Sequence, residues 1–285
     1  MSEFTDGSNV LGDMIARLAT KDNSEAGDYY DEEGFLMCHN CHTRKQFELD
    51  VLGHVRKVPV MCKCKEEELA KENEERERRE VEAKIKRLQE KGITDAQYLK
   101  WRIETDDRQN AKISDAVIRY IDKWDEMRDK NMGILFYGNV GTGKTFYAAC
   151  IANKLIERGV GVLMTNIPSL MSAMSKDFER EKNRILHEIS TVPLLILDDI
   201  GVERDTTYGY EKIQEIIDTR YRSGLPLIVT TNLSPHELTN PQDLRYKRVY
   251  DRVLEMCYPI LVDGRSRREV KAKSMRSDAR DILGI

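Results

Sequence analysis

The chain contains 285 residues, which is enough for one medium-sized domain with a buried core and a smaller second domain. Its 46 basic and 50 acidic residues nearly balance, so the net charge neither indicates nor excludes nucleic acid as a partner. The first residues lack the basic and apolar regions of a signal peptide, and no run approaches the roughly 20 apolar residues of a membrane span, so we expect neither.

Residues 1–34 are acidic and polar except for one short amphipathic stretch. Its apolar side chains are spaced to fall on one face of a helix: Leu11, Met14, Ile15 and Leu18. We expect this helix to pack on the module that follows it. The alternative is a helix offered to a partner protein.

Residues 35–64 hold four of the six cysteines, arranged as a C-x-x-C pair and a C-x-C pair separated by twenty residues. These four are Cys38, Cys41, Cys62 and Cys64. Thiolates at these spacings can enclose Zn²⁺ in a tetrahedron, and because four sulfurs complete the shell, such a zinc is structural rather than catalytic. Four unrelated reduced cysteines are the alternative. The other two, Cys150 and Cys257, are typical of buried thiols, and the whole set favours a cytoplasmic protein.

Residues 65–93 are almost entirely charged and are predicted to form a connector helix. Its oppositely charged residues are paired four positions apart: Glu67–Lys71, Glu72–Arg76, Glu74–Arg78, Glu75–Arg79, Glu80–Lys84 and Glu82–Lys86. Pairs in this order stabilise an exposed helix by about 0.2–0.5 kcal/mol each. A solvated helix that ends at Gly92 is therefore favoured over an arm that binds nucleic acid.

From residue 94 onward the composition becomes that of a globular domain, which we assign to residues 94–285. Apolar residues at helical spacing predict one helix over 111–130: Ile113, Val117, Tyr120, Ile121, Trp124 and Met127. Five apolar runs then alternate with helical segments: Ile134–Tyr137, Val160–Met164, Leu194–Leu197, Leu227–Thr230 and Ile260–Val262. Uniformly apolar strands are buried on both faces and helical crossovers join parallel neighbours, so the sequence predicts an α/β fold with a parallel sheet.

A glycine-rich loop follows the first of these strands and precedes a helix expected over 146–158. Its residues satisfy the pattern G-x-x-x-x-G-K-[ST]: Gly138, Asn139, Val140, Gly141, Thr142, Gly143, Lys144 and Thr145. In such loops, backbone N–H groups and the helix N-terminus bind the phosphates of a nucleoside triphosphate. Lys144 then reaches the β- and γ-phosphates, and the hydroxyl of Thr145 can ligate Mg²⁺. The alternative is a turn without a ligand, but such a turn has no need of the Lys-Thr pair.

Polar side chains end the third and fourth of the predicted strands. Asp198 and Asp199 follow the third strand, and Asn232 follows the fourth. Because open parallel sheets bind ligands at the carboxyl ends of their strands, we expect Asp198 to hold Mg²⁺ beside Thr145 and Asp199 to orient the attacking water. An acidic strand end without such a role is the alternative. If the fourth strand lies between the first and the third, Asn232 points at the γ-phosphate.

Arg248 and Arg252 lie four residues apart, on one face of a predicted helix. Two arginines on one edge suit a subunit boundary, where either can enter the ATP site of a neighbour and stabilise charge at the γ-phosphate. A pair of surface arginines in salt bridges is the alternative.

Taken together, these motifs resemble one family, the helicase-loader ATPases of the DnaC/DnaI type, which belong to the AAA+ superfamily and are close to the IstB transposition helper. The resemblance spans roughly residues 110–270 and is carried by these segments: Gly138–Thr145, Val162–Thr165, Leu170–Met174, Leu195–Val202, Thr230–Asn232, Tyr250–Val253 and Gly264–Arg268. Many families share the phosphate loop and the acidic strand end. The Ser-Ala-Met, Asp-Asp-Ile-Gly and Asp-Arg-Val segments are much narrower.

The resemblance implies that the nucleotide is ATP, that Asn232 is the residue called sensor 1 and that Arg252 is the arginine finger. It also implies a AAA+ P-loop domain with a truncated C-terminal lid, since only 23 residues follow Val262. The usual sensor 2 of the lid is then lost or replaced by Arg267 or Arg268. The sequence departs from related ATPases at Asp199, where Glu is more common.

For the whole protein, the resemblance implies an ATP-dependent loader that delivers a hexameric replicative helicase to single-stranded DNA. Residues 1–64, with their helix and zinc module, would grip the helicase, while the ATPase domains form a homo-oligomer. The alternative is a transposition helper of the IstB kind, which binds duplex DNA and activates a transposase; the zinc module and the connector favour the loader. A small-molecule kinase is disfavoured, because Asn232 and the arginine pair would then have no task.

Overall fold

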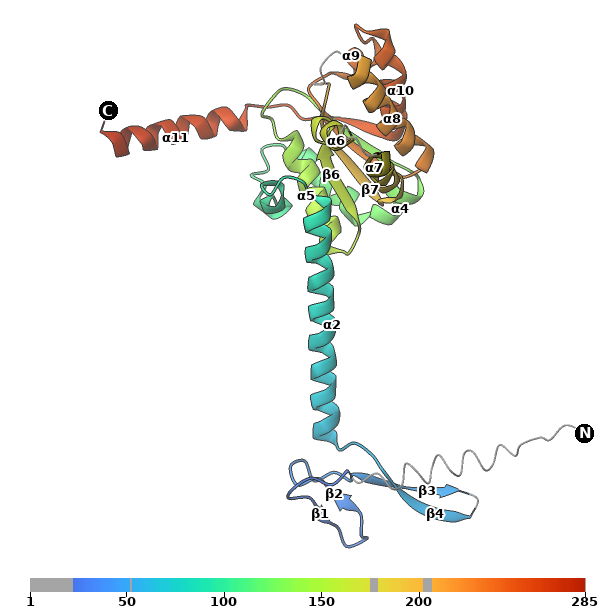
Figure 1. The fold of residues 1–285 in the computed structure, drawn as a ribbon. Coiled ribbons are helices and arrows are strands. Elements are labelled where there is room, and N and C mark those ends of the chain that lie inside the picture. The colour runs from blue at the N-terminus through green and yellow to red at the C-terminus, as the bar shows by residue number, and fades with distance from the viewer. Residues whose placement is uncertain (1–22, 52, 175–178, 202–206, 285) are drawn as a thin grey trace, which may run out of the picture. The chain divides into compact units, whose positions relative to one another are not determined.

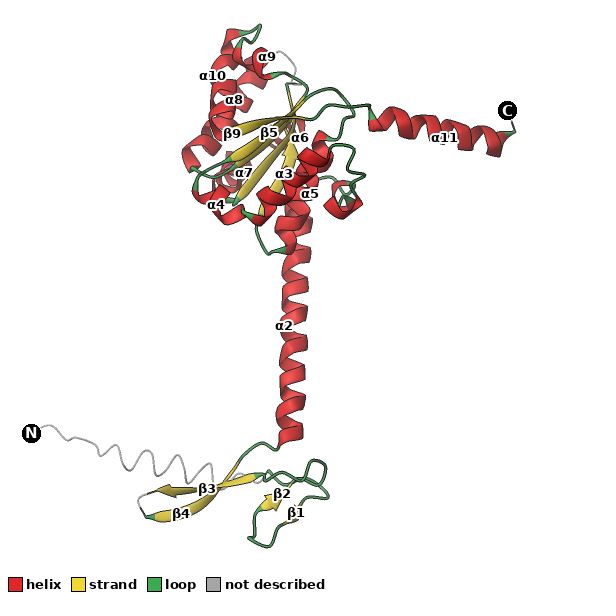
Figure 2. Cartoon of the chain, turned by 180° about the vertical axis from the view of Figure 1, so that it is seen from behind, coloured by secondary structure: helices red, strands yellow, loops and turns green. Residues whose placement is uncertain are grey.

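The chain divides into two units, Met1–Glu80 and Val81–Ile285. The structure, a computed structural model, describes residues 23–51, 53–174, 179–201 and 207–284 (Figure 1, Figure 2). The amphipathic stretch at residues 11–18 lies outside the described residues. The boundary between the units falls inside one helix, α2 (Lys63–Gly92). The sequence-based division instead treats residues 65–93 as a separate connector between residues 1–64 and 94–285.

Two antiparallel hairpins form the described part of the first unit. The smaller one joins β1 (Tyr29–Tyr30) to β2 (Leu36–Met37), and the larger one joins β3 (Gln46–Val51) to β4 (His54–Pro59). Phe35 is buried beside the small hairpin, where Arg44 and Lys57 each lie 4.1 Å from the centre of its ring. An apolar core this small supplies little stability by itself. A unit of this kind therefore needs a further crosslink, either covalent or through a metal.

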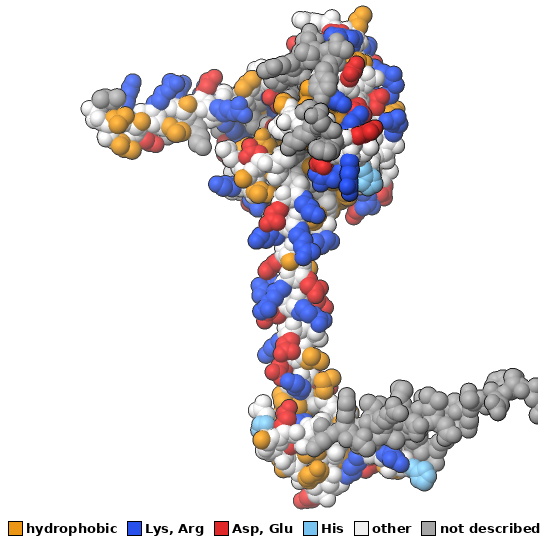
Figure 3. All heavy atoms as spheres, in the orientation of Figure 1, with side chains coloured by type: hydrophobic (Ala, Val, Ile, Leu, Met, Phe, Trp, Pro, Cys, Tyr) orange, Lys and Arg blue, Asp and Glu red, His pale blue; other side chains and the backbone are white. Residues whose placement is uncertain are grey.

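Helix α2 is exposed along most of its length and carries mixed positive and negative side chains (Figure 3). One of its predicted ion pairs, Glu75–Arg79, forms at 2.6 Å. The helix ends at Gly92, where only glycine fits, because a β-carbon at this position would lie only 2.0 Å from the carbonyl oxygen of Val162. The last turn of α2 therefore packs directly against the sheet of the second unit.

A five-stranded parallel sheet forms the centre of the second unit, in the order β6-β7-β8-β5-β9. The strands are β5 (Gly133–Tyr137), β6 (Val162–Asn166), β7 (Leu194–Ile200), β8 (Leu227–Thr231) and β9 (Cys257–Leu261). The predicted parallel α/β fold is confirmed, and β8 does lie between β7 and β5. The sequence predicts that the last strand begins at Ile260, but it begins at Cys257. Its pairing with β5 starts with Cys257 opposite Gly133, directly after the preceding helix ends at Met256.

Helices cover both faces of this sheet. One face carries α3 (Ala111–Asp122), α4 (Trp124–Asp129) and α5 (Lys144–Glu157), and the other carries α6 (Ile167–Met174), α7 (Glu179–Thr191), α8 (Thr207–Ser223) and α10 (Lys247–Met256). Alternate side chains of β7 pack into the two cores. Leu195 and Leu197 lie in the core on the side of α6, α7, α8 and α10, and Leu194 and Ile196 lie in the core on the side of α3 and α5. Both faces are apolar for this reason, as the uniform strand pattern predicted.

Shorter elements and a last helix complete the unit. They are η1 (Tyr98–Lys100), η2 (Ile103–Thr105), α9 (Pro235–Thr239), η3 (Leu244–Tyr246) and α11 (Arg267–Leu283). Beyond β9, the described residues contain one further helix, α11. Among the described residues, no helix combines the length and the apolar character needed to cross a membrane.

The single helix predicted over 111–130 is wrong, because the structure has two helices separated at Lys123. This residue has a non-helical backbone, with φ of −99° and ψ of 24°. The break starts α4 at Trp124, whose ring packs 6.2 Å from that of Tyr120 in the same core. Apolar spacing could not reveal the break, because both helices pack on one core.

One cation is completely buried in the second unit, and it links three segments of the chain. Arg220 of α8 has no exposed surface and donates hydrogen bonds to the carbonyl oxygens of Ile189, Val192, Pro193 and Pro226, at 2.5–3.2 Å. Burial lowers the pKa of Arg220 to about 9, so the guanidinium remains protonated at neutral pH. The cation stabilises the C-terminal end of α7, where backbone carbonyl groups lack partners within the helix.

We predict that Arg220→Leu lowers the free energy of unfolding by about 3 kcal/mol or more, because several buried carbonyl groups lose their only side-chain donor. Urea denaturation of the folded protein measures the change. Arg222→Leu is the matched control, since Arg222 is exposed on the same helix and its replacement should change stability by less than about 0.5 kcal/mol. Equal unfolding midpoints for the two variants would contradict the structural role of Arg220.

Candidate nucleotide site and metal centre

The loop from 138 to 143 connects β5 to the N-terminus of α5. Gly143 precedes the helix with φ of 110°, a left-handed conformation that only glycine adopts without strain. Gly141 is needed for a different reason, since a β-carbon there would lie 2.3 Å from the hydroxyl oxygen of Ser266. The first N–H groups of α5 have no partner within the helix, and together with the helix dipole they favour an anion at this end.

Lys144 is nearly buried at the start of α5, and three oxygen atoms hold its ammonium group. Its Nζ donates to the carbonyl oxygens of Gly138 and Asn139, each at 2.8 Å, and to Oδ1 of Asn232 at 2.7 Å. Desolvation lowers the pKa of Lys144, and the nearby carboxylates of Asp199 and Asp198 oppose this shift. A desolvated cation held in this way is a strong attractor for phosphate oxygens.

Asp198 is buried at the end of β7, and hydrogen bonds fix both of its carboxylate oxygens. Thr230 of β8 donates through Oγ1 to Oδ1 at 2.7 Å, and Tyr98 of η1 donates through its hydroxyl to Oδ2 at 3.0 Å. Thr145 lines the same cavity, so a carboxylate and a hydroxyl oxygen lie where Mg²⁺ could be held. Oxygen donors of this kind fit magnesium.

Asp199 and Asn232 join the acidic strand end to the lysine. The amide of Asn232 donates to Oδ1 of Asp199 at 3.2 Å while its own oxygen accepts from Lys144. Asp199 has φ of 59°, which is unusual for a residue other than glycine and coincides with an irregular register between β7 and β8. Desolvation and the charge of Asp198 raise the pKa of Asp199. Both properties are typical of a residue with a chemical role.

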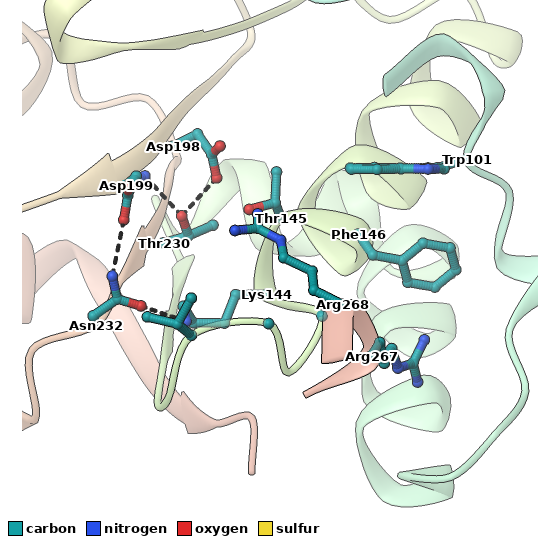
Figure 4. A pocket seen from close by; sticks show the side chains of 13 residues that line it. Trp101, Lys144, Thr145, Phe146, Asp198, Asp199, Thr230, Asn232, Arg267 and Arg268 are labelled. Carbon is teal, nitrogen blue, oxygen red and sulfur yellow. Dashed lines mark hydrogen bonds between the residues drawn. The ribbon is translucent and has the colours of Figure 1, made fainter. Parts of the chain in front are cut away.

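A cavity of about 390 Å³ opens over these residues (Figure 4). Its lining includes the two arginines named from the sequence, Arg267 and Arg268, and adds two aromatic side chains that were not predicted, Trp101 and Phe146. In Figure 4, Arg268 extends across the cavity toward Thr145, whereas Arg267 lies on the side of Phe146. Arg267 is also engaged elsewhere, since it contacts Asp106 at 3.3 Å and Asp107 at 2.7 Å. Of these two arginines, Arg268 is the one that extends across the cavity (Figure 4).

The structure does not bring Arg252 or Arg248 into this cavity of the same chain. Arg252 forms an ion pair with Asp218 of α8 and lies 5.1 Å from the ring centre of Tyr221, with 18% of its side chain exposed. Arg248 is 63% exposed and lies 3.9 Å from the same carboxylate. Both arginines therefore share Asp218, and neither can act on a nucleotide in its own chain from this position.

Sequence reasoning missed four residues of this site: Tyr98, Trp101, Phe146 and Thr230. Tyr98 and Trp101 precede the globular core and belong to no motif, so no local signal marks them. Thr230 stands two residues before Asn232 in β8, and only its pairing with β7 places its hydroxyl beside Asp198. A polar residue within a buried apolar strand was the one available signal.

The four cysteines of the first unit come together as predicted from their spacing. Their sulfur atoms all lie within 4.8 Å of one another, and none forms a disulfide. The sulfur of Cys64 lies 3.6 Å from that of Cys38 and 3.3 Å from that of Cys62. Sulfurs bound tetrahedrally to zinc at about 2.3 Å are separated by about 3.8 Å, so the cluster has the size of a zinc shell.

The electrostatics of the cluster also suit a cation. A hydrogen bond with the hydroxyl of Thr43 helps to lower the pKa of Cys41 to about 5, whereas the neighbouring sulfurs of Cys62 and Cys38 raise the pKa of Cys64 to about 12. Four thiolates cannot share so small a volume without a compensating charge. A divalent metal supplies that charge, and four cysteines are the donor set that Zn²⁺ prefers.

Comparison with known proteins shows similarity to one family. A family model described as "IstB-like ATP binding protein" matches residues 60–275. Replicative helicase loader DnaC of Escherichia coli (strain K12) is 34% identical over 156 residues, which cover 54% of this chain and 60% of that protein. Replicative helicase loader DnaI of Bacillus subtilis (strain 168) is 30% identical over 150 residues, which cover 49% of this chain and 48% of that protein. The chain thus spans less than two thirds of either curated relative.

A solved structure resembles part of this chain. The crystal structure of DnaI superposes with a TM-score of 0.52 at 26% sequence identity, and the match covers 62% of this chain and 95% of that one.

We predict about one zinc ion per chain in protein purified without added metal, as measured by elemental analysis. Cys64→Ser should lose the zinc and unfold the hairpins of the first unit, because the metal is their main crosslink. Cys257→Ser is the matched control and should retain the metal, since Cys257 is a buried thiol at the start of β9. A metal-free wild-type protein with folded hairpins would contradict the zinc centre.

Proposed function

Because this chain belongs to the family of IstB-like ATP-binding proteins, we propose that it is an ATPase that loads a hexameric replicative helicase onto single-stranded DNA. The observation that carries the proposal is the ATP site itself, in which Lys144, Asp199 and Asn232 are joined by hydrogen bonds, together with the similarity to two replicative helicase loaders. The proposed cellular location is the cytoplasm, where a replicative helicase acts.

The residues of the site support a direct mechanism of ATP hydrolysis. The loop from Gly138 to Thr145 binds the phosphates, and Lys144 exchanges its carbonyl partners for phosphate oxygens. Thr145 and Asp198 would hold Mg²⁺, which neutralises charge on the β- and γ-phosphates. Asp199, whose raised pKa favours proton acceptance, orients the attacking water. The hydrogen bond from Asn232 keeps the carboxylate of Asp199 beside the γ-phosphate.

The first unit is the proposed helicase-binding module, with structural zinc at its four cysteines. Two large hydrophobic side chains are exposed on one face of its larger hairpin: Phe47 at 59% and Leu49 at 36%, two residues apart in β3. Exposed apolar side chains on so small a unit are typical of a protein-binding surface. The exposed large hydrophobic side chains of α2, Leu69 and Val81, lie far apart on an otherwise charged helix, so we propose that the helix serves as a connector.

The second candidate is a transposition helper of the IstB kind. The observation in its favour is the family model, whose description refers to IstB. The curated relatives favour the loader instead, since both are replicative helicase loaders. The two functions differ in the partner protein and in the form of DNA bound, which makes them separable by a binding experiment.

We predict that the full chain binds a purified hexameric replicative helicase of the same cell and that Phe47→Glu weakens this binding at least tenfold, because a charge replaces an apolar contact. Glu48→Gln is the matched control, since Glu48 is exposed next to Phe47 but points to the opposite face of β3. Size-exclusion chromatography with the purified partner measures both. Binding to a transposase and to duplex DNA, with no binding to the helicase, would establish the second candidate instead.

We also propose that the ATPase domains form a homo-oligomer in which Arg252 acts on the ATP of the neighbouring chain. An arginine finger of this kind works in trans, so it must leave Asp218 when two chains associate. The shared carboxylate of Asp218 would then pass to Arg248, which already lies 3.9 Å from it.

We predict that Arg252→Ala binds ATP normally but loses DNA-stimulated hydrolysis by about 10³-fold or more. Mixing it with Asp199→Asn protein should restore part of the activity, because one chain supplies the arginine and its neighbour the carboxylate. Lys144→Ala, which cannot bind the γ-phosphate, is the null reference. A steady-state phosphate-release assay gives each rate, and no recovery at any mixing ratio, with both variants assembled, would show that the site is complete within one chain.

A further inference from the structure

The hydroxyl of Tyr98 reaches the acidic end of β7 from a segment 100 residues earlier in the chain. It donates to Oδ2 of Asp198 at 3.0 Å, while Thr230 donates to Oδ1 at 2.7 Å. The carboxylate therefore has one donor on each oxygen, and each oxygen keeps a further lone pair for a cation. A carboxylate held from both sides cannot rotate, so its free lone pairs point in fixed directions.

Two contacts hold Tyr98 in this place. Its ring stacks on that of Trp101, with ring centres 5.0 Å apart, and Trp101 lines the nucleotide cavity. Its carbonyl oxygen accepts from the amide of Asn153 at 2.7 Å, and the same amide donates to the carbonyl oxygen of Trp101 at 2.8 Å. Asn153 is completely buried in α5, so the helix that begins with Lys144 also fixes η1.

The chain between α2 and Tyr98 is fixed along the edge of the sheet. Gly92 packs against the backbone of Val162, and Ile93 forms a bridge with Met164 in β6. The backbone N–H and the hydroxyl of Thr94 both donate to the carbonyl oxygen of Met164, at 3.2 and 3.1 Å. Thr94 is thus held at the edge strand β6, only a few residues before Tyr98, whose hydroxyl contacts Asp198.

We propose that Tyr98 is a positioning residue for the Mg²⁺ carboxylate of Asp198 and that it makes the metal site depend on how the end of α2 is seated against β6. This inference rests on the proposed ATP site and adds a residue that the phosphate-loop motif does not contain. Tyr98 acts through Asp198, because its hydroxyl donates to the carboxylate and Tyr98 is not among the residues that line the cavity. The end of α2 acts through Tyr98, since the segment between them is held at Met164.

We expect Tyr98→Phe to weaken metal binding about tenfold, because it removes one charge-assisted hydrogen bond and keeps the stacked ring. Mn²⁺ is the probe, and electron paramagnetic resonance of free Mn²⁺ in the presence of a non-hydrolysable ATP analogue gives its dissociation constant. The affinity for the analogue in EDTA should stay within about twofold of wild type, because the phosphate loop is untouched. A general loss of structure would lower both affinities together.

Tyr120→Phe is the matched control for the loss of a buried tyrosine hydroxyl. The hydroxyl of Tyr120 donates to the carbonyl oxygen of Met132 at 3.1 Å, away from the cavity, so this variant should bind Mn²⁺ as wild type does. Wild-type Mn²⁺ affinity in Tyr98→Phe would overturn the inference while leaving the ATP site intact. A wild-type protein that binds neither the analogue nor Mn²⁺ would overturn the proposed ATP site and the inference with it.

The part played by α2 is tested with Gly92→Ala, whose added β-carbon would lie 2.0 Å from the carbonyl oxygen of Val162 and must displace the helix end. We expect this variant to weaken Mn²⁺ binding severalfold in the wild-type background and to have less than about a twofold effect in the Tyr98→Phe background. Independent, fully additive effects of the two substitutions would overturn the coupling between α2 and the metal site.

Discussion

The hydrogen bonds of Asn232 are the contacts on which the rest of the site depends. One amide group accepts from Lys144 and donates to Asp199, so it joins the cation of the phosphate loop to the acid of the neighbouring strand. This is possible only because β8 lies between β5 and β7, which brings the carboxyl ends of all three strands to one edge. The parallel sheet is therefore the frame of the site, and its two apolar cores keep the strand order rigid.

Two buried cations in the second unit show how similar surroundings lead to different roles. Arg220 is surrounded by backbone carbonyl groups that satisfy most of its donors, so its charge is used entirely within the fold. Lys144 also contacts two carbonyl groups, but it opens onto a cavity and lies near two carboxylates. A desolvated cation with access to solvent can exchange its partners for a phosphate, whereas a sealed one cannot.

The two units obtain their stability in different ways, and this bears on their proposed roles. The second unit has two extensive apolar cores on either side of one sheet. The first has a few buried side chains, among them Phe35, Leu36, Cys38 and Cys62, and four sulfurs in the arrangement of a metal shell. A metal crosslink at these sulfurs would free the apolar residues of the hairpin from core packing, so that side chains such as Phe47 could remain exposed for the proposed partner.

The sequence by itself determined the features that depend on local spacing. The phosphate loop, the four cysteines, the charged α2 and the apolar strands are each encoded within a short stretch, so their positions could be read directly. The strand order stayed conditional, and only the structure placed β8 next to β7. The break at Lys123 and the ion pair between Arg252 and Asp218 also came from the structure alone, because each depends on how separate helices pack. The same holds for Tyr98 and Thr230, whose hydroxyls meet Asp198 across 100 and 32 residues of chain. The pairing of β8 with β7 places Thr230, and the packing of η1 on α5 places Tyr98, so neither contact follows from a local pattern.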